Sequence, residues 1–379
     1  MDRSLIVAEP DGAAMRYRIL EVLRQYGQSR LAESGQDDQA RRRHAQHYLR
    51  LAQLVPPILW DDADQRRWLP RCRAERANFD AALHWAAGRA GQTREVGVEL
   101  ACALAPFWEA EGSISEGLTR LEAVLPSARG ALRTRVLDKA CRFAFRQGDY
   151  ALAAARIQES AEIKRAKGDE LGMANRLSQL GLYRICQGEP GAGRVLLEQA
   201  LGITSAHGDE HGTAAANVYL GVGALLNDET DEAQRRVLAG AAVWATAGDQ
   251  PRLAVCRSAL VLVLLERGDL TGARAVAAEV LAIVAGPLRG MPEDAGWLWA
   301  AMLLAEAEGR DQAALRLLGA IGAWSQRGHR WIEPLRRRYQ PVTDRLLERT
   351  DPAVAAALMT EGAAMSPLEL AARALASNG

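Results

Sequence analysis

The sequence predicts an all-α protein, a tetratricopeptide-like α-solenoid built as a right-handed superhelix of helical hairpins of about 40 residues each, with a short N-terminal β-hairpin. Three observations lead to this fold class. Glycines recur every twenty residues, an acid follows most of them, and a small residue stands at a fixed distance beyond alternate ones. A hydrophobic share of 49% and a charged share of 25% are typical of a globular chain and exclude a disordered one.

The turn residues set the length of each helix. They stand at Gly148, Gly168, Gly188, Gly208, Asp228, Gly248 and Gly268, and Gly290 and Gly309 nearly continue the series. A glycine after an apolar-periodic run supplies the left-handed conformation that ends a helix without a Cβ clash. The acid that follows six of these glycines suits the N-terminus of the next helix. Twenty residues therefore hold one helix of about four turns and a tight connection, and two such helices make a hairpin.

A small residue marks the place where the two helices of each hairpin cross. Five positions after the turn inside the hairpin, the residue is glycine or alanine in all six hairpins: Gly117, Ala153, Gly193, Ala233, Ala273 and Ala314. The tetratricopeptide pattern has a small residue there, where the helices approach closely. A single hairpin cannot bury its own apolar face, so about three or more must stack to form a core.

Both ends of the chain depart from the repeat pattern. Two β-prone runs at 4–9 and 15–20 flank the turn signal Pro10-Asp11-Gly12, and a helix over about 20–34 ends at Gly35. A lone two-stranded hairpin is marginal in water, so we expect it to be mobile or to pair elsewhere. The predicted segments are 1–34 for the hairpin and its helix, 35–90 for a helical linker or N-terminal cap, 91–325 for the repeats and 326–379 for a C-terminal helical cap.

Six stretches of the sequence carry a resemblance to a known family. They read RYRILEVLRQYGQSRLAESG, RRRHAQHYLRLA, ERANFDAALHWA, FWEAEGSISEGLTRLEAVL, LRLLGAIGAW and MSPLELAARAL. In order and spacing they resemble large bacterial STAND-type transcriptional regulators, among them LuxR-type and AfsR/SARP-like proteins with an NTPase module, a winged helix and a tetratricopeptide sensor. The resemblance covers nearly the whole chain. It implies that residues 1–34 are a winged-helix remnant whose β-hairpin is the wing.

The resemblance also implies modules outside this chain. Met1 falls within a motif that usually reads L-V-D-[RK]-S-L, so we expect the chain to be the back half of a longer protein, or the product of a gene whose start codon was assigned inside the reading frame. ATP is then expected only on a missing upstream NTPase module. The glycine cluster at 188–194 lacks the Lys-Ser/Thr of a P-loop, so we expect no cofactor in this chain. LuxR-type relatives continue into a DNA-reading helix-turn-helix, whereas this sequence ends at Gly379, so we expect no direct nucleic-acid binding.

Catalytic and metal-binding motifs are missing from the sequence. It has no GxSxG or HExxH, and its five cysteines form no CxxC pair, so each thiol is expected to be a small buried side chain. His207 and His211 are expected to straddle the turn at Gly208 without a third ligand. The run Arg336-Arg337-Arg338 is interpreted as an exposed helix face. We therefore predict that the protein is not an enzyme and holds no metal.

Charge and hydropathy bear on location. Lys+Arg and Asp+Glu are both 47, so no net field draws the molecule to nucleic acid or to an anionic membrane. No run of about 18 apolar residues is free of charge, and the N-terminus shows no targeting signal. We predict a cytoplasmic protein that has no membrane partner.

The remaining candidate site is the concave groove of the solenoid, lined by the first helix of each hairpin. Aligning the repeats on their turns predicts inner positions for Glu109, Asp138, Arg142, Arg146, Asn175, Ser178, Tyr219 and Trp299. Such a mixed surface suits a peptide, a protein segment or a small effector, although ordinary interhelical packing would also explain any one of these residues.

The functional prediction follows from the groove and the resemblance together. We predict a non-catalytic, ligand- or protein-binding sensor module of a STAND-type transcriptional regulator. In a full-length protein its partner would be the upstream NTPase and winged-helix module. The alternative is a free-standing tetratricopeptide adaptor or scaffold for protein–protein interaction.

Overall fold

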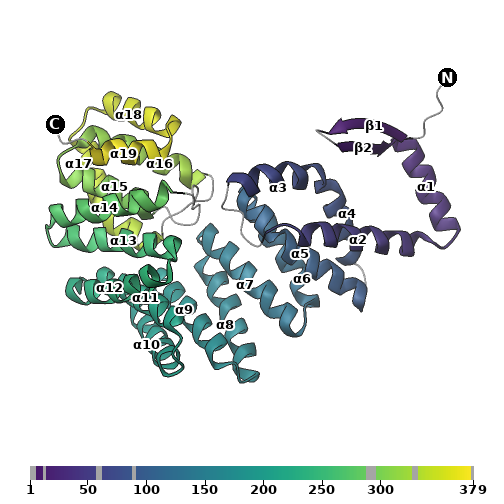
Figure 1. Ribbon diagram of the computed structural model, residues 1–379, viewed down its shortest axis with the longest axis horizontal. Coiled ribbons are helices and arrows are strands. Elements are labelled where there is room, and N and C mark those ends of the chain that lie inside the picture. Colours follow the sequence, from purple (N-terminus) through teal and green to yellow (C-terminus); the bar gives the residue numbers. More distant parts are fainter. Residues whose placement is uncertain are drawn as a thin grey trace.

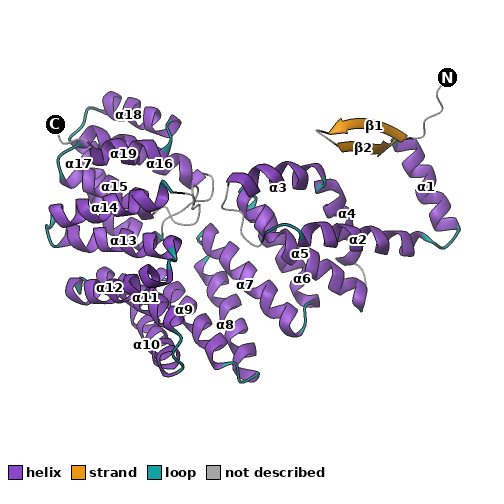
Figure 2. Ribbon diagram, viewed as in Figure 1, coloured by secondary structure: helices purple, strands orange, loops and turns teal. Residues whose placement is uncertain are grey.

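The computed structural model describes residues 6–11, 14–56, 62–87, 91–286, 296–326 and 332–376. These residues form one two-stranded antiparallel sheet and nineteen α-helices. From α5 to α16 the helices pack as antiparallel hairpins that stack along a curve (Figure 1). Within the described residues the strands lie only at the N-terminal end (Figure 2). The predicted all-α solenoid with a short β-hairpin is confirmed.

The elements before the repeats are one hairpin and four helices. They are β1 (Ile6–Asp11), β2 (Ala14–Ile19), α1 (Glu21–Glu33), α2 (Asp37–Gln53), α3 (Asp62–Ala74) and α4 (Arg76–Ala87). The helix predicted over about 20–34 is α1, and Gly35 beyond it has a positive φ of 70°. The helices α2, α3 and α4 pack against the first helix of the repeat array.

Six hairpins make up the repeat array. Their helices are α5 (Gln92–Glu111) and α6 (Ile114–Val124), α7 (Gly130–Gln147) and α8 (Tyr150–Ala166), α9 (Glu170–Cys186) and α10 (Pro190–Ala206), α11 (Glu210–Leu226) and α12 (Thr230–Ala247), α13 (Gln250–Glu266) and α14 (Leu270–Val284), and α15 (Gly296–Ala307) and α16 (Asp311–Gln326). Three more helices follow: α17 (Glu333–Glu348), α18 (Pro352–Ala364) and α19 (Pro367–Ala376).

The turn residues behave as their spacing predicts. A positive φ occurs at Gly148, Gly168, Gly188, Gly208, Asp228, Gly248, Gly268 and Gly309. Gly290 lies outside the described residues. The acids after five of these glycines cap the next helix, since each side chain accepts a hydrogen bond from the backbone amide three residues on: Asp149, Asp169, Asp209, Asp249 and Asp269. The helix ends are therefore set by local chemistry that repeats along the chain.

The small residues lie where the helices of a hairpin cross. All six are buried, and Gly193 on α10 shows why the site is small. A Cβ on Gly193 would stand 2.6 Å from the carbonyl oxygen of Gly181 on α9 and 2.6 Å from Cγ1 of Ile185. The two backbones therefore touch at this crossing, as the tetratricopeptide spacing predicts.

The stacked hairpins bury two large apolar clusters. One runs from Ala45 on α2 to Tyr183 on α9, and the other from Ala214 on α11 to Ala374 on α19. Each hairpin thus completes the core of its neighbour, as in other solenoids. In the described part of the chain, no helix is both long enough and apolar enough to cross a membrane.

The N-terminal hairpin differs from its prediction in where the strands end. Pro10 and Asp11, predicted as a turn, belong to β1, and Pro10 stands opposite Met15. An edge strand accepts proline because the missing amide faces away from the ladder, so pairing continues past the expected turn. Gly12 lies outside the described residues. The side chains of Met15, Tyr17 and Ile19 are exposed along one face of β2.

Candidate binding surface of the solenoid

The predicted groove residues all lie on first helices of the hairpins. Glu109 lies on α5, and Asp138, Arg142 and Arg146 lie on α7. Asn175 and Ser178 lie on α9, Tyr219 on α11 and Trp299 on α15. The structure shows what each side chain contacts, and the eight do not form one constellation.

Glu109, Arg142 and Arg146 form an ion-paired group between α5 and α7. The Glu109 carboxylate pairs with the Arg146 guanidinium at 2.8 Å and with the Arg142 guanidinium at 2.9 Å. The side chains of Glu109 and Arg146 are only 10% and 7% exposed, while that of Arg142 is 34% exposed. Buried charges of this kind must be paired, so Glu109 and Arg146 bind each other. Arg142 is the member that also reaches the surface.

Asp138 joins three successive helices. Its carboxylate accepts a hydrogen bond from the Ser160 hydroxyl on α8 at 2.8 Å and forms an ion pair with Arg176 on α9. The carboxylate is a third exposed, so it also borders solvent. A ligand that approached Asp138 would have to compete with Arg176.

Besides Arg146, two of the predicted groove residues are buried. Ser178 and Trp299 have almost no exposed surface, because neighbouring helices cover them, so neither lines an open surface. The Ser178 hydroxyl has no hydrogen-bond partner among the described residues. Asn175 and Tyr219 are half-buried. The other five, Glu109, Asp138, Arg142, Asn175 and Tyr219, are partly exposed, and a ligand-binding role for them stays a prediction.

Aromatic side chains beside the ion-paired group were not among the predicted residues. The Phe145 ring on α7 stacks on Tyr183 with ring centroids 5.0 Å apart and lies 5.5 Å from the ring of Tyr150. Burial raises the pKa of the Tyr183 hydroxyl well above its ordinary value. Phe145 is half-buried and lies one turn or less from Arg142 and Arg146 on the same helix, so it extends that surface with an apolar patch. Phe145 follows Arg142 by three residues, and residues at this spacing share a helix face, so the sequence could have identified it as part of the same surface.

The helix α17 runs along the inner side of the array. It contacts α9, α11 and α15, which are first helices of their hairpins. Its buried side chains recur every three or four residues and so lie on one face of the helix: Leu335, Tyr339, Thr343 and Leu346. The backbone amide of Glu333 donates to the Tyr150 hydroxyl of α8 at 3.0 Å. The sequence predicted only a C-terminal cap over 326–379, and the contact with the inner surface was missed.

The arginine run on α17 was interpreted as an exposed face, and this holds for two of its three members. Arg336 and Arg337 pair with Glu333 of the same helix, and hydrogen bonding from Arg336 lowers the pKa of Glu333 to about 2. The interpretation is wrong for Arg338, whose side chain is 20% exposed. The Arg338 guanidinium pairs with Asp228 at 2.7 Å and with Glu266 at 3.1 Å, because its side chain lies on the face of α17 that packs on the repeat array.

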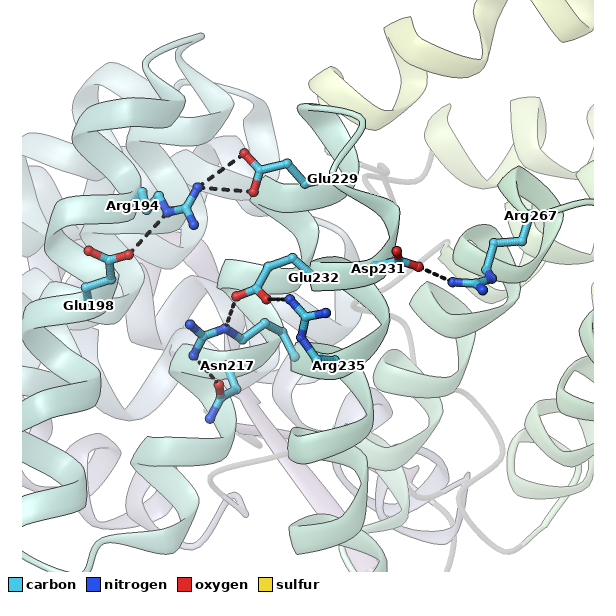
Figure 3. A network of polar contacts seen from close by, with 9 residues as sticks. Arg194, Glu198, Asn217, Glu229, Asp231, Glu232, Arg235 and Arg267 are labelled. Carbon is cyan, nitrogen blue, oxygen red and sulfur yellow. Dashed lines mark hydrogen bonds and ion pairs between the residues drawn. The ribbon is translucent and has the colours of Figure 1, made fainter.

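A network of polar contacts ties the middle hairpins together through α10, α11, α12 and the end of α13 (Figure 3). Arg194 binds Glu229 and Glu198, and Arg236 binds Glu232 and Asn217. Arg235 and Arg267 add ion pairs to Glu232 and Asp231. Half-exposed pairs of this kind contribute little each, so we interpret the network as support for hairpin stacking.

The described residues show no constellation for metal chemistry or for a reactive thiol. They contain no group of three or more His, Cys, Asp or Glu side chains placed to hold a metal ion. All five cysteines are buried as predicted, and burial raises the pKa of Cys72 to about 11 and that of Cys141 to about 12. His207 ends α10 and His211 lies in α11, so the two straddle the turn as predicted.

Comparison with known proteins gives two kinds of likeness. No family model matches the chain. Curated proteins of Mycobacterium bovis and Mycobacterium tuberculosis, each named "Putative HTH-type transcriptional regulator", are 26% identical to it over 294 residues. The match covers 74% of this chain and 32% of those proteins, so the chain spans about a third of the length of these relatives.

One solved structure is similar over most of the chain. It is the crystal structure of a Rap protein complexed with competence and sporulation factor, with a TM-score of 0.54 and 12% sequence identity. The match covers 84% of this chain and 85% of that one. At this identity the likeness shows the fold alone, which is an array of tetratricopeptide-like helical hairpins.

Proposed function

We propose that this chain is the ligand- or protein-binding sensor module of a STAND-type transcriptional regulator of the LuxR or AfsR/SARP-like kind, and that it is not catalytic by itself. The observation that carries the proposal is the similarity to two HTH-type regulators over 74% of a chain that folds for the most part as a helical repeat array. Repeat arrays present extended inner surfaces, and binding is what such surfaces are suited to. ATP would then bind on another module of the longer protein.

The half of the inner surface formed by α5, α7 and α9 is the proposed effector site. Arg142 offers a partly exposed guanidinium, and Phe145 offers an apolar face next to it. Asn175 on α9 adds an amide that donates and accepts hydrogen bonds. A peptide, protein segment or small effector with an acidic group beside an apolar one would match this set.

The regulatory step would be a shift between two states of an attached switch. An effector moves such an equilibrium only by its difference in affinity for the two states. Binding between α5, α7 and α9 would alter how tightly the first hairpins stack, because Glu109 and Asp138 join those helices. The upstream NTPase and winged-helix module is the proposed recipient of that change, and this chain itself makes no contact with DNA in the proposal.

The alternative function is that of a free-standing tetratricopeptide adaptor. The similar Rap protein, solved in complex with competence and sporulation factor, favours binding by such an array. The mass of the protein in its native cells separates the two functions. A mass far above 41.1 kDa, with GxxxxGK[ST] in the added sequence, supports the regulator, and a mass near 41.1 kDa supports the adaptor.

A reporter experiment tests the effector site directly. Arg142→Glu reverses a partly exposed charge on the inner surface, and Arg235→Glu reverses an exposed charge on α12, away from the site. We expect Arg142→Glu to abolish the change in transcript levels that follows overexpression of the full protein, and Arg235→Glu to leave it intact. Equal effects of the two variants, with equal melting temperatures, would refute the proposed site.

A further inference from the structure

The helix α17 is placed as a ligand would be placed on the inner surface of the array. Its start meets Tyr150 at the α7–α8 hairpin, and Arg338 in its middle meets Asp228 and Glu266. At its end Arg349 binds Glu306 and Asp311 at the α15–α16 hairpin. One helix of 16 residues therefore contacts hairpins that are far apart in the sequence, across the inside of the superhelix.

The surface beneath α17 is apolar with an acidic rim. Leu335, Tyr339 and Leu346 belong to the same apolar cluster as residues of α11, α13 and α15. The rim carries the carboxylates of Asp228 and Glu266, both of which pair with Arg338. An amphipathic helix with a cation beside its apolar stripe matches a surface of this composition.

The contacts of the neighbouring helices show that α17 is not needed to attach the C-terminal cap. The helices α16 and α18 pack directly on each other although α17 lies between them in the sequence. A Cβ on Gly319 of α16 would collide with the Met359 carbonyl, and one on Gly362 of α18 would collide with the Arg316 carbonyl. The backbones of α16 and α18 therefore touch, and α19 packs on α14, α15 and α16. The cap helices α18 and α19 are therefore attached to the array by contacts of their own, in which α17 takes no part.

We propose that α17 is a replaceable occupant of the inner surface formed by α9, α11, α13 and α15, and that the natural partner of this surface is an amphipathic helix of another protein. That helix would carry apolar side chains at the spacing of Leu335, Tyr339 and Leu346 and an arginine at the place of Arg338. Asp228 is 80% exposed, so an incoming arginine reaches it before α17 has left. The inference goes beyond the proposed function, since it holds for an adaptor as well as for a regulator.

Hydrogen exchange tests whether α17 leaves the surface on its own. We expect the amides of 336–346 in the full chain to exchange together and at least about tenfold faster than those of α13 and α18, as a locally opening unit does. Arg338→Ala should accelerate exchange in α17 further without changing α18. Arg337→Ala, which removes an ion pair with Glu333 of the same helix, should not accelerate it. Exchange of α17 at the rate of α18 in every variant would refute the proposal.

Competition by a peptide tests the kind of partner. A fluorescent peptide of residues 332–349 is titrated into the full chain, into Arg338→Glu and into the matched control Arg337→Glu. We expect it to bind Arg338→Glu about five- to tenfold more tightly than the control, because the resident helix is then repelled by Asp228 and Glu266. Equal binding to the two variants, or no binding to Arg338→Glu, would contradict the proposal.

Exchanging the two charges tests whether Arg338→Glu acts by repelling α17 or by unfolding the protein. Arg338→Glu combined with Asp228→Arg restores an attractive pair across the same gap, and it should return the exchange rate of α17 toward that of the original chain. Loss of the melting transition in Arg338→Glu, without rescue by the second change, would show that α17 is a structural part of the core. That result would also overturn the proposal while leaving the proposed effector site at α5, α7 and α9 intact.

Discussion

The repeat array and the N-terminal β1–β2–α1 segment use similar amounts of apolar sequence but bury them very differently. Every helix from α7 to α14 has fully buried side chains, whereas α1 has none. In the hairpin, Ile6 stands opposite Ile19, and Ala8 opposite Tyr17, and all four side chains are exposed. Stacking gives each repeat a neighbour that covers its apolar face. Among the described residues, no element covers this face of the β1–β2 hairpin.

The difference shows where the stability of the chain lies. In the array, backbone contacts, caps and ion pairs repeat at each hairpin, so a single change disturbs a tightly packed neighbour. In the N-terminal segment the same kind of change places atoms in solvent or removes a solvent-exposed ion pair, so it disturbs no packed neighbour. Matched substitutions in the two regions therefore measure how far the stability of the chain depends on each.

The largest effect is expected where two helices touch through glycine. Gly319→Ala on α16 places a methyl group against the Met359 carbonyl of α18, so the helices must separate. We expect a loss of about 3 kcal/mol in the free energy of unfolding, measured by urea denaturation. Gly322→Ala, on the same helix but with no heavy atom within 4 Å of the new Cβ, should be neutral or stabilising. Similar losses for both would contradict the close contact.

Removing a buried carboxylate should have nearly as large an effect. Glu109→Ala removes the carboxylate that pairs with Arg146 in a site only 7% exposed. We expect a loss of about 3 kcal/mol in the free energy of unfolding, since removing one side of a buried ion pair is strongly destabilising. Glu21→Ala removes an exposed partner of Arg24 in α1 and should not move the melting temperature. A small effect of Glu109→Ala would show that the α5–α7 contact does not depend on this carboxylate.

What the sequence predicts well is what nearby residues decide. The helix ends follow from the turn glycines, and five of the acids after them cap the next helix as expected. Even Asp228, which replaces glycine in the series, keeps the positive φ of 62°. A local rule that recurs every twenty residues needs no knowledge of the rest of the chain.

The parts that the sequence did not predict depend on distant contacts. Arg336, Arg337 and Arg338 look alike in the sequence, but only Arg338 meets acids 72 and 110 residues away. Ser178 and Trp299 have inner positions in their repeats, and neighbouring helices cover them. Aligning repeats gives the direction of a side chain on its own helix, and it gives no information on what folds back over that helix.

Losing a helix cap should have an intermediate effect. Asp269→Ala removes the carboxylate that accepts a hydrogen bond from the Gly272 amide at the start of α14. We expect a loss of about 1 kcal/mol in the free energy of unfolding. Asp269→Asn keeps an accepting oxygen and should recover most of that loss. A substitution at Leu20, which makes no side-chain cap to α1, should have no comparable effect, and an equal loss there would mean that α1 is coupled to the array.

The smallest expected effect, that of a glycine-to-alanine change inside a helix, distinguishes α1 from the repeat array most directly. Gly27 in α1 and Gly202 in α10 both lie inside helices with nothing within 4 Å of an added Cβ, so alanine should favour the helix by about 0.5–1 kcal/mol at either site. In α10 the gain should raise the melting temperature, because α10 unfolds with the array. In α1 it should only slow hydrogen exchange between residues 24 and 33, because a helix without buried side chains opens independently. A higher melting temperature for Gly27→Ala would instead place α1 in the cooperative unit, and the exposed hairpin beside it would then be anchored as well.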